Sequence, residues 1–210
     1  MIEPNNVIKI FKLIALLMNR NTSYVELIKI LFGAKPPEDH NFMTYDYKPH
    51  IEKIVVYGTS EAGRPVFSVI IPTYNRGGTL KTTLNSIGRQ KKLLKKDFET
   101  IITDNGSQND VEDIVSEFTK MHGGRAVYIR LLKNYGGDFA RNVAALHASG
   151  RYLAFTDDDC EVPPGWLWEF KKNLDADSRL SGVGGYKTPT PESIGHDIYH
   201  KFLMWGHFRS

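Results

Sequence analysis

From Val66 onward, short apolar runs alternate with segments of helical periodicity, and this rhythm constrains the fold more than any other feature. The apolar runs are rich in β-branched residues and are typical of strands; they cover residues 67–71, 98–103, 126–132, 152–156 and 180–186. Between them lie segments with apolar residues every three to four positions, at residues 79–89, 111–121, 138–149 and 166–174. This alternation predicts an α/β fold, with a mainly parallel sheet covered by helices on both faces.

The first part of the chain lacks this rhythm. Residues 7–19 and 23–33 have the periodicity and end signals of two helices, and Ile51–Tyr57 is a candidate strand before a turn or linker at residues 58–65. We therefore divide the chain into an N-terminal helical extension, residues 1–60, and an α/β domain, residues 61–210.

Composition narrows the class of protein. The net charge of +3 is too small to indicate nucleic acid as a partner. The single cysteine excludes an intrachain disulfide and favours the reducing cytoplasm. The apolar segment at residues 7–18 is shorter than a membrane span of about 20 residues. It contains Lys9 and Lys12 and is either a core helix or an interfacial helix that contacts the inner face of the membrane.

Polar side chains follow each of the four main predicted strands. They lie at residues 72–76, 104–107, 133–138 and 157–159. In parallel sheets ligands bind beyond the carboxyl ends of the strands, where loops lead into helices. Any one of these segments could be an ordinary turn, but the four together predict a ligand site at this edge of the sheet.

Three adjacent aspartates, Asp157, Asp158 and Asp159, end the fourth of these strands. Carboxylates this close repel one another, and a hard cation such as Mg²⁺ or Mn²⁺ would relieve the repulsion. The alternative is an acidic cap, in which Asp159 or Glu161 stabilises the N-terminus of the next helix. The position at a strand exit favours the metal.

The glycines of the third exit do not form a known nucleotide motif. Gly136 and Gly137 lack the G-x-G-x-x-G spacing, and no G-x-x-x-x-G-K-[ST] loop is present, which argues against an NAD enzyme and a P-loop ATPase. They would allow a ligand to approach the backbone, and Arg141, one turn further on, could pair with a phosphate or form a surface salt bridge.

Four motifs in this order resemble the nucleotide-binding half of a family 2 glycosyltransferase with the GT-A fold, over residues 67–187. They are F-S-V-I-I-P-T-Y-N-R at 67–76, I-I-T-D-N-G-S at 101–107, N-Y-G-G-D-F-A-R-N at 134–142 and Y-L-A-F-T-D-D-D at 152–159. The run P-P-G-W-L at 163–167 is also typical after the acidic motif.

The resemblance implies a nucleotide-sugar donor, most often a UDP-sugar. Asp104 would hydrogen-bond the base, and Arg141 would lie near the base or the phosphates. Asp159 would be the first metal ligand, and Asp157 would contact the metal or the ribose. The cation, Mn²⁺ or Mg²⁺, would stabilise the leaving nucleoside diphosphate. The implied donor-site residues are Pro72, Thr73, Tyr74, Asn75, Asp104, Asn105, Gly106, Arg141, Asp157 and Asp158.

Two departures from the family pattern bear on function. Asn105 stands where the common D-D-G-S motif has its second acid, and no Glu-Asp pair that could act as general base follows Asp159. We therefore expect a metal-dependent, inverting transferase whose acceptor part is truncated in this chain, with a glycan, lipid or protein acceptor. The alternative is a catalytically silent nucleotide-sugar-binding module. The later carboxylates, none in a matching motif, are Glu169, Asp175, Asp177, Glu192 and Asp197.

Overall fold

The structure, a computed structural model, describes residues 45–58, 63–180 and 182–185. The chain divides into two compact units, residues 1–46 and 47–210, and the second contains the sheet. The expected helices at residues 7–19 and 23–33 lie outside the described residues, and so does the segment 7–18 that could contact a membrane.

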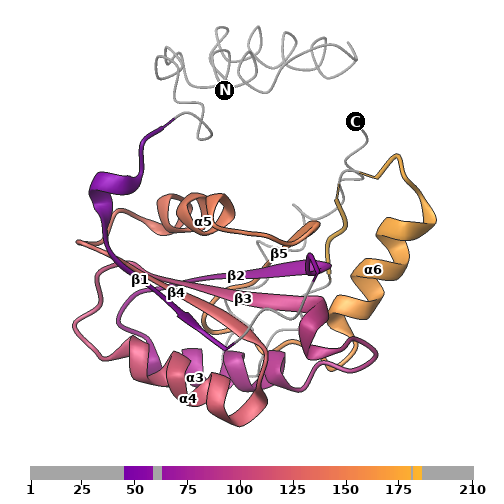
Figure 1. The fold of residues 1–210 in the computed structure, drawn as a ribbon, viewed down its shortest axis with the longest axis horizontal. Helices are drawn as coiled ribbons and strands as arrows, with labels where there is room; N and C mark the ends of the chain where they lie inside the picture. Colours follow the sequence, from indigo (N-terminus) through magenta and orange to yellow (C-terminus); the bar gives the residue numbers. More distant parts are fainter. Residues whose placement is uncertain (1–44, 59–62, 181, 186–210) are drawn as a thin grey trace, which may run out of the picture. The chain divides into compact units, whose positions relative to one another are not determined.

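A five-stranded sheet forms the centre of the second unit (Figure 1). The strand order is β1-β4-β3-β2-β5, in which β1 pairs antiparallel with β4 and all other neighbours are parallel. The mainly parallel sheet expected from the alternating pattern is therefore confirmed. The strands are β1 (Ile51–Tyr57), β2 (Phe67–Thr73), β3 (Phe98–Asp104), β4 (Arg125–Leu131) and β5 (Tyr152–Phe155).

Helices cover both faces of this sheet (Figure 1). α5 (Gly137–Leu146) lies on one face, where its small Ala140 and Ala144 pack in one cluster with Ile70 and Ile101. α3 (Gly77–Gly88) and α4 (Val111–His122) lie on the other face, and Leu167 of α6 (Trp166–Ala176) joins the core on that side. Two short 3₁₀ helices, Lys48–His50 and Lys95–Asp97, precede β1 and β3.

The central strands are buried on both faces, as expected of a parallel sheet between helices. Every residue of β3 is buried, and in β2 only Pro72 is partly exposed. Two buried clusters result, one on each side of the sheet, and together they hold the carboxyl ends of β2 and β3 at the same edge.

Two details of the sequence-based prediction need correction. β1 precedes the boundary that we placed between residues 60 and 61, yet it pairs with β4, so the sheet unit begins earlier, at Tyr47. The expected strand at residues 180–186 is not seen in its described part, because Leu180 forms only an isolated bridge and residues 182–185 have no regular structure.

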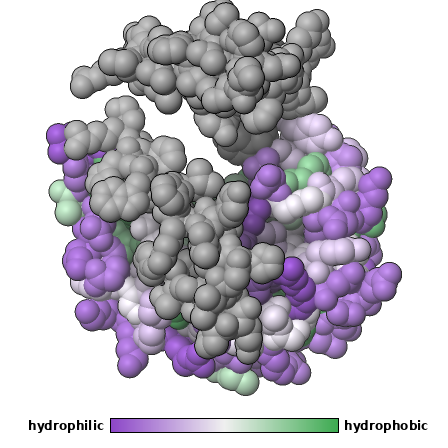
Figure 2. Space-filling view, turned by 180° about the vertical axis from the view of Figure 1, so that it is seen from behind, coloured by the Kyte–Doolittle hydropathy of each residue, from purple (hydrophilic) through white to green (hydrophobic). Residues whose placement is uncertain are grey.

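One face of the described surface is mostly polar. Seen from behind, the described atoms are mainly hydrophilic, with small and separate hydrophobic areas (Figure 2). Among the described helices, none combines the length and the hydropathy that a membrane crossing requires.

Candidate donor site

Hydrogen bonds join the segments that follow β2, β3, β4 and β5. The backbone N–H of Asn75 donates to Ser107 Oγ at 2.8 Å, and the Asn75 side-chain oxygen accepts from the N–H of Gln108 at 2.8 Å. Asn75 has a φ of 56°, a left-handed conformation that asparagine tolerates better than most residues. Its side chain therefore ties the loop after β2 to the loop after β3.

The loop after β4 is held to the loop after β3 by the side chain of Asn105. Its Nδ2 donates to Asn134 Oδ1 at 2.8 Å, and its Oδ1 accepts from the N–H of Tyr135 at 2.9 Å. The segment after β5 is held to the end of β2 by Thr73, whose hydroxyl donates to Asp158 Oδ2 at 2.7 Å. The structure thus brings together all four polar segments that the sequence placed at one edge.

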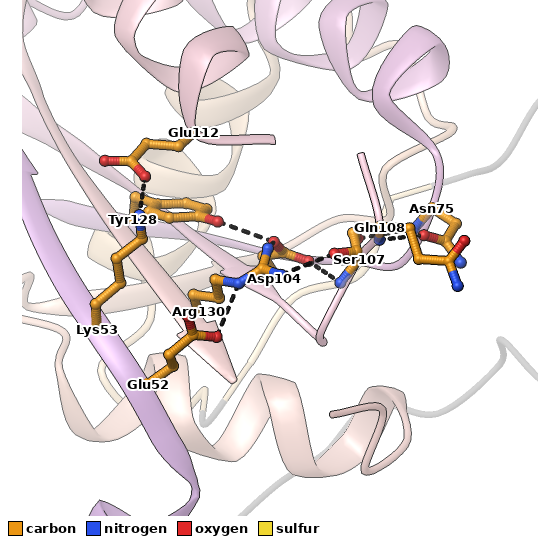
Figure 3. A network of polar contacts seen from close by, with 9 residues as sticks. All are labelled: Glu52, Lys53, Asn75, Asp104, Ser107, Gln108, Glu112, Tyr128 and Arg130. Carbon is orange, nitrogen blue, oxygen red and sulfur yellow. Dashed lines mark hydrogen bonds and ion pairs between the residues drawn. The ribbon is translucent and has the colours of Figure 1, made fainter. Parts of the chain in front are cut away.

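Asp104 is fully buried at the centre of a polar network (Figure 3). Its Oδ2 accepts hydrogen bonds from the Tyr128 hydroxyl and from Arg130 Nη1, both at 2.8 Å, and its Oδ1 accepts from the N–H of Ser107 at 2.8 Å. Burial raises the pKa of Tyr128, which keeps the phenol protonated as a donor. Arg130 also donates to Glu52 and to the Ser107 carbonyl, each at 2.9 Å.

This network gives Asp104 a supporting role within the protein, and the contact with a base that the family resemblance implies stays a prediction. Both carboxylate oxygens are engaged within the protein, and no part of the side chain is exposed. The carboxylate fixes the turn at residues 104–107 through its hydrogen bond from the N–H of Ser107. Sequence reasoning missed Tyr128 and Arg130, although their alternation along β4 places them on the same face as Asp104.

Gly106 occupies a position that excludes a side chain. Its φ is 78°, and an added Cβ would lie 2.6 Å from the Cα of Lys133. The glycine therefore allows the turn after β3 to approach the loop after β4.

We predict that Gly106→Ala lowers the free energy of unfolding by about 2 kcal/mol, because alanine would be strained at this φ and would displace Lys133. Urea unfolding of the two proteins measures the loss. Gly78→Ala is the matched control, since an added Cβ there meets no atom within 4 Å. Equal stability of the two variants would contradict the close approach.

The three aspartates differ in burial and in their partners. Asp158 is buried and bound to Thr73, whereas Asp157 and Asp159 are exposed. One ligand atom from each of Asp157, Asp159 and Cys160 can be found within 4.8 Å of the others. The two carboxylates suit Mg²⁺ or Mn²⁺, which prefer oxygen, and the soft thiol does not. The donor set thus fits a hard cation held by Asp157 and Asp159.

The acidic-cap alternative does not match the structure. α6 begins at Trp166, its N-cap residue is Gly165, and no side-chain hydrogen bond caps this end of the helix. The acid in its first turn is Glu169. Glu161 instead lies 3.8 Å from Arg89. Neither Asp159 nor Glu161 caps the helix.

Two arginines contact the triplet. Arg141 Nη2 donates to Asp157 Oδ1 at 2.5 Å, and Arg141 Nη1 donates to Asp138 at 3.1 Å. Arg76 Nη1 lies 3.3 Å from Asp158 Oδ1 and 3.0 Å from Asp159 Oδ2. Arg141 was expected as a donor-site residue, whereas Arg76 was expected only as part of the polar segment 72–76 and was given no role of its own.

The remaining expected donor-site residues lie around this cluster. Tyr74 is exposed in the loop after β2, and Pro72, near the end of β2, is partly exposed. Of the later carboxylates, Glu169, Asp175 and Asp177 form ion pairs with lysine or arginine on or just after α6. Glu192 and Asp197 lie outside the described residues.

Comparisons with known proteins agree with this architecture. The family model described as "Glycosyl transferase family 2" matches residues 68–202, more than half of the chain. Chondroitin synthase of Escherichia coli is 34% identical over 122 residues, which cover 57% of this chain and 17% of that protein. Glycosyltransferase AglE of Haloferax volcanii is 34% identical over 103 residues, which cover 49% of this chain and 33% of that protein.

Solved structures show the same fold. S. aureus TarS 1–349 in complex with UDP has a TM-score of 0.50 and 29% identity, covering 59% of this chain and 38% of that one. The mannosyltransferase PcManGT from Pyrobaculum calidifontis, in complex with GDP-Man and Mn²⁺, has a TM-score of 0.55 and 26% identity, covering 66% and 39%.

The chain matches a third or less of the length of the two curated relatives named above. The family-model match to residues 68–202 nevertheless includes β3, β4, β5 and all but the first residue of β2, together with the four strand exits and the acidic triplet. The chain therefore belongs to glycosyl transferase family 2 and has the GT-A fold.

Proposed function

We propose that this chain forms the donor-binding part of an enzyme that transfers a sugar from a UDP-sugar to an acceptor hydroxyl, with inversion and with Mn²⁺ or Mg²⁺. The observation that carries the proposal is the arrangement of the triplet. Asp157 and Asp159 are exposed and close enough to share a cation, whereas Asp158 is buried against Thr73. Two arginines beside them would face the phosphates of a donor.

The solved neighbours support this assignment. One TarS structure is in complex with UDP, and the PcManGT structure is in complex with GDP-Man and Mn²⁺. We favour UDP because the TarS complex has the higher sequence identity, 29% against 26%. The binding experiment below includes both nucleotides.

Each residue has a distinct part in the proposed donor site. Tyr74, exposed beside Pro72, offers an aromatic face on which a base can stack. Asn75, Asn105 and Gly106 shape the nucleoside pocket through the contacts that join their loops. Asp104 supports this pocket from beneath.

Asp157 and Asp159 would hold the cation, which when bound supplies Lewis-acid stabilisation of the leaving diphosphate. Arg141 would pair with a phosphate oxygen in place of Asp157. Transfer would be a direct displacement, in which the acceptor oxygen bonds to the anomeric carbon while the bond between that carbon and the diphosphate breaks. A general base would take the proton of the acceptor hydroxyl. We do not assign this base to a described residue.

The acceptor would be a glycan, a lipid or a protein. A catalytically silent nucleotide-sugar-binding module remains the second candidate, because Glu169, Asp175 and Asp177 are engaged in ion pairs. Release of UDP from UDP-glucose with an acceptor mixture separates the two candidates. Binding without any release favours the silent module.

We predict that the chain binds UDP or a UDP-sugar at least about tenfold more tightly with Mn²⁺ than with EDTA, because the cation offsets the repulsion between the diphosphate and the aspartates. Calorimetry with UDP-glucose and GDP-mannose, each with and without Mn²⁺, measures this. Asp159→Ala should remove the metal dependence. Asp175→Ala, which removes an exposed carboxylate on α6, should retain it.

Two results would count against the proposal. If neither nucleotide sugar binds in the presence of Mn²⁺, the proposal of a donor site is wrong. Unchanged metal dependence in Asp159→Ala would show that the ligands are assigned to the wrong residues.

A further inference from the structure

We propose that Arg76 binds the donor diphosphate and competes with the cation for Asp159, so that cation and nucleotide bind this site cooperatively. This inference rests on the proposed function and adds to it a residue and a cooperativity between cation and nucleotide.

Arg76 contacts the triplet through one nitrogen. Nη1 lies within 3.3 Å of Asp158 and 3.0 Å of Asp159, and the side chain is 57% exposed. The two carboxylates differ, because Asp158 is held by Thr73 whereas Asp159 is exposed. Contacts through Nη1 alone leave the rest of the guanidinium fork available for a bidentate partner.

A cation at Asp159 would lie close to the guanidinium. Two positive groups that share one carboxylate repel each other, and this repulsion weakens binding of the cation alone. A diphosphate changes the balance because it carries enough negative charge to hold both the guanidinium and the metal. The arginine can then leave the carboxylate to the metal and bind a phosphate.

The position of Arg76 in the fold suits a phosphate partner. It directly precedes α3, a helix of 12 residues whose N-terminus has no side-chain cap and begins with Gly77 and Gly78. Free backbone N–H groups and the helix dipole at such an end favour anions. Arg76 and this helix end therefore offer positive charge beside the aspartates.

The test is a thermodynamic linkage experiment on the 210-residue chain. Binding of Mn²⁺ is followed by the electron paramagnetic resonance signal of free Mn²⁺, with and without UDP. In the parent protein we expect UDP to tighten Mn²⁺ binding at least about fivefold, and Mn²⁺ to tighten UDP binding by the same factor.

Arg76→Gln should change the two affinities in opposite directions. Removal of an exposed competing ion pair should tighten binding of Mn²⁺ alone by about two- to fivefold. Loss of a charged hydrogen bond should weaken binding of UDP in the presence of Mn²⁺ by about tenfold or more. Arg76→Lys keeps the charge but not the forked guanidinium group. Its affinities for Mn²⁺ and for UDP should lie between those of the parent protein and those of Arg76→Gln.

Arg89→Gln is the matched control, because Arg89 is similarly exposed and its carboxylate partner is Glu161, outside the triplet. Arg89→Gln should leave the affinities for Mn²⁺ and for UDP within about twofold of those of the parent protein. If Arg76→Gln weakens binding of Mn²⁺ alone, or leaves UDP binding unchanged, the role assigned to Arg76 is overturned. If the parent chain binds no nucleotide, the proposed function and this inference both fail; if it binds and Arg76→Gln has no effect, only this inference fails.

Discussion

Replacing Asp104 by asparagine is expected to lower the free energy of unfolding by about 3 kcal/mol. The carboxylate is fully buried and accepts hydrogen bonds from Tyr128, Arg130 and the N–H of Ser107. Asparagine keeps the size but removes the charge opposite Arg130, and it places an N–H₂ group against one of these donors. Arg130 is 26% exposed and keeps Glu52 as a second partner, which limits the loss.

Urea unfolding near neutral pH measures this effect. Asp175→Asn is the control, since it removes an exposed carboxylate paired with Lys171 and should cost no more than about 0.5 kcal/mol. Tyr128→Phe removes one donor to Asp104 and should cost about 1 kcal/mol. If Asp104→Asn costs no more than Asp175→Asn, the network of Figure 3 does not stabilise the fold.

The order of strands and helices could be predicted because each element has its own local signal. The β-branched run at Phe67–Ile71 and the apolar spacing of Val111–Met121 identify a strand and a helix without reference to distant residues. The convergence of four polar exits followed from the parallel arrangement alone. The secondary structure of residues 180–186 was harder to predict, because a short apolar run is compatible with several structures.

The partners of Asp104 within the protein could not be predicted from its motif, because they come from another strand. Tyr128 and Arg130 lie more than twenty positions away, and only the pairing of β3 with β4 brings them to Asp104. Asp158 shows the same difficulty in the triplet. Its neighbours are exposed, and only the contact with Thr73 distinguishes it from them.

The second large effect is expected at Glu99, which is buried at the opposite end of β3 from Asp104. One oxygen accepts from Ser68 Oγ at 2.5 Å and from the N–H and hydroxyl of Ser149, both at 2.7 Å. The other oxygen pairs with Arg125. Glu99 therefore connects β2, β3, β4 and the loop before β5.

Glu99→Gln is expected to lower the free energy of unfolding by about 3 kcal/mol near neutral pH, because it leaves Arg125 without its charged partner and disturbs three hydrogen bonds. Burial alone would raise the pKa of Glu99. The hydrogen bonds from Ser68 and Ser149, together with the charge of Arg125, outweigh burial and hold the pKa below its ordinary value of 4.5.

The sign of the pH dependence follows from this lowered pKa. Above pH 4.5, Glu99 is ionised in both the folded and the unfolded chain, and its full stabilising effect is present. As the pH falls below 4.5 towards the folded pKa, the unfolded chain binds a proton that the folded chain does not, so stability is lost. The stability difference between the parent protein and Glu99→Gln should therefore shrink, by no more than about 0.8 kcal/mol, between about pH 7 and pH 4.

Urea unfolding of both proteins at several pH values in this range tests the prediction. The other carboxylates titrate in both proteins, so the difference between the two curves isolates Glu99. Glu117→Gln, which removes an exposed carboxylate paired with Lys81, is the control and should stay within about 0.5 kcal/mol of the parent at every pH. A difference between parent and Glu99→Gln that widens as the pH falls would mean that Glu99 binds its proton more tightly in the folded chain, because its hydrogen bonds and Arg125 would then fail to offset its burial.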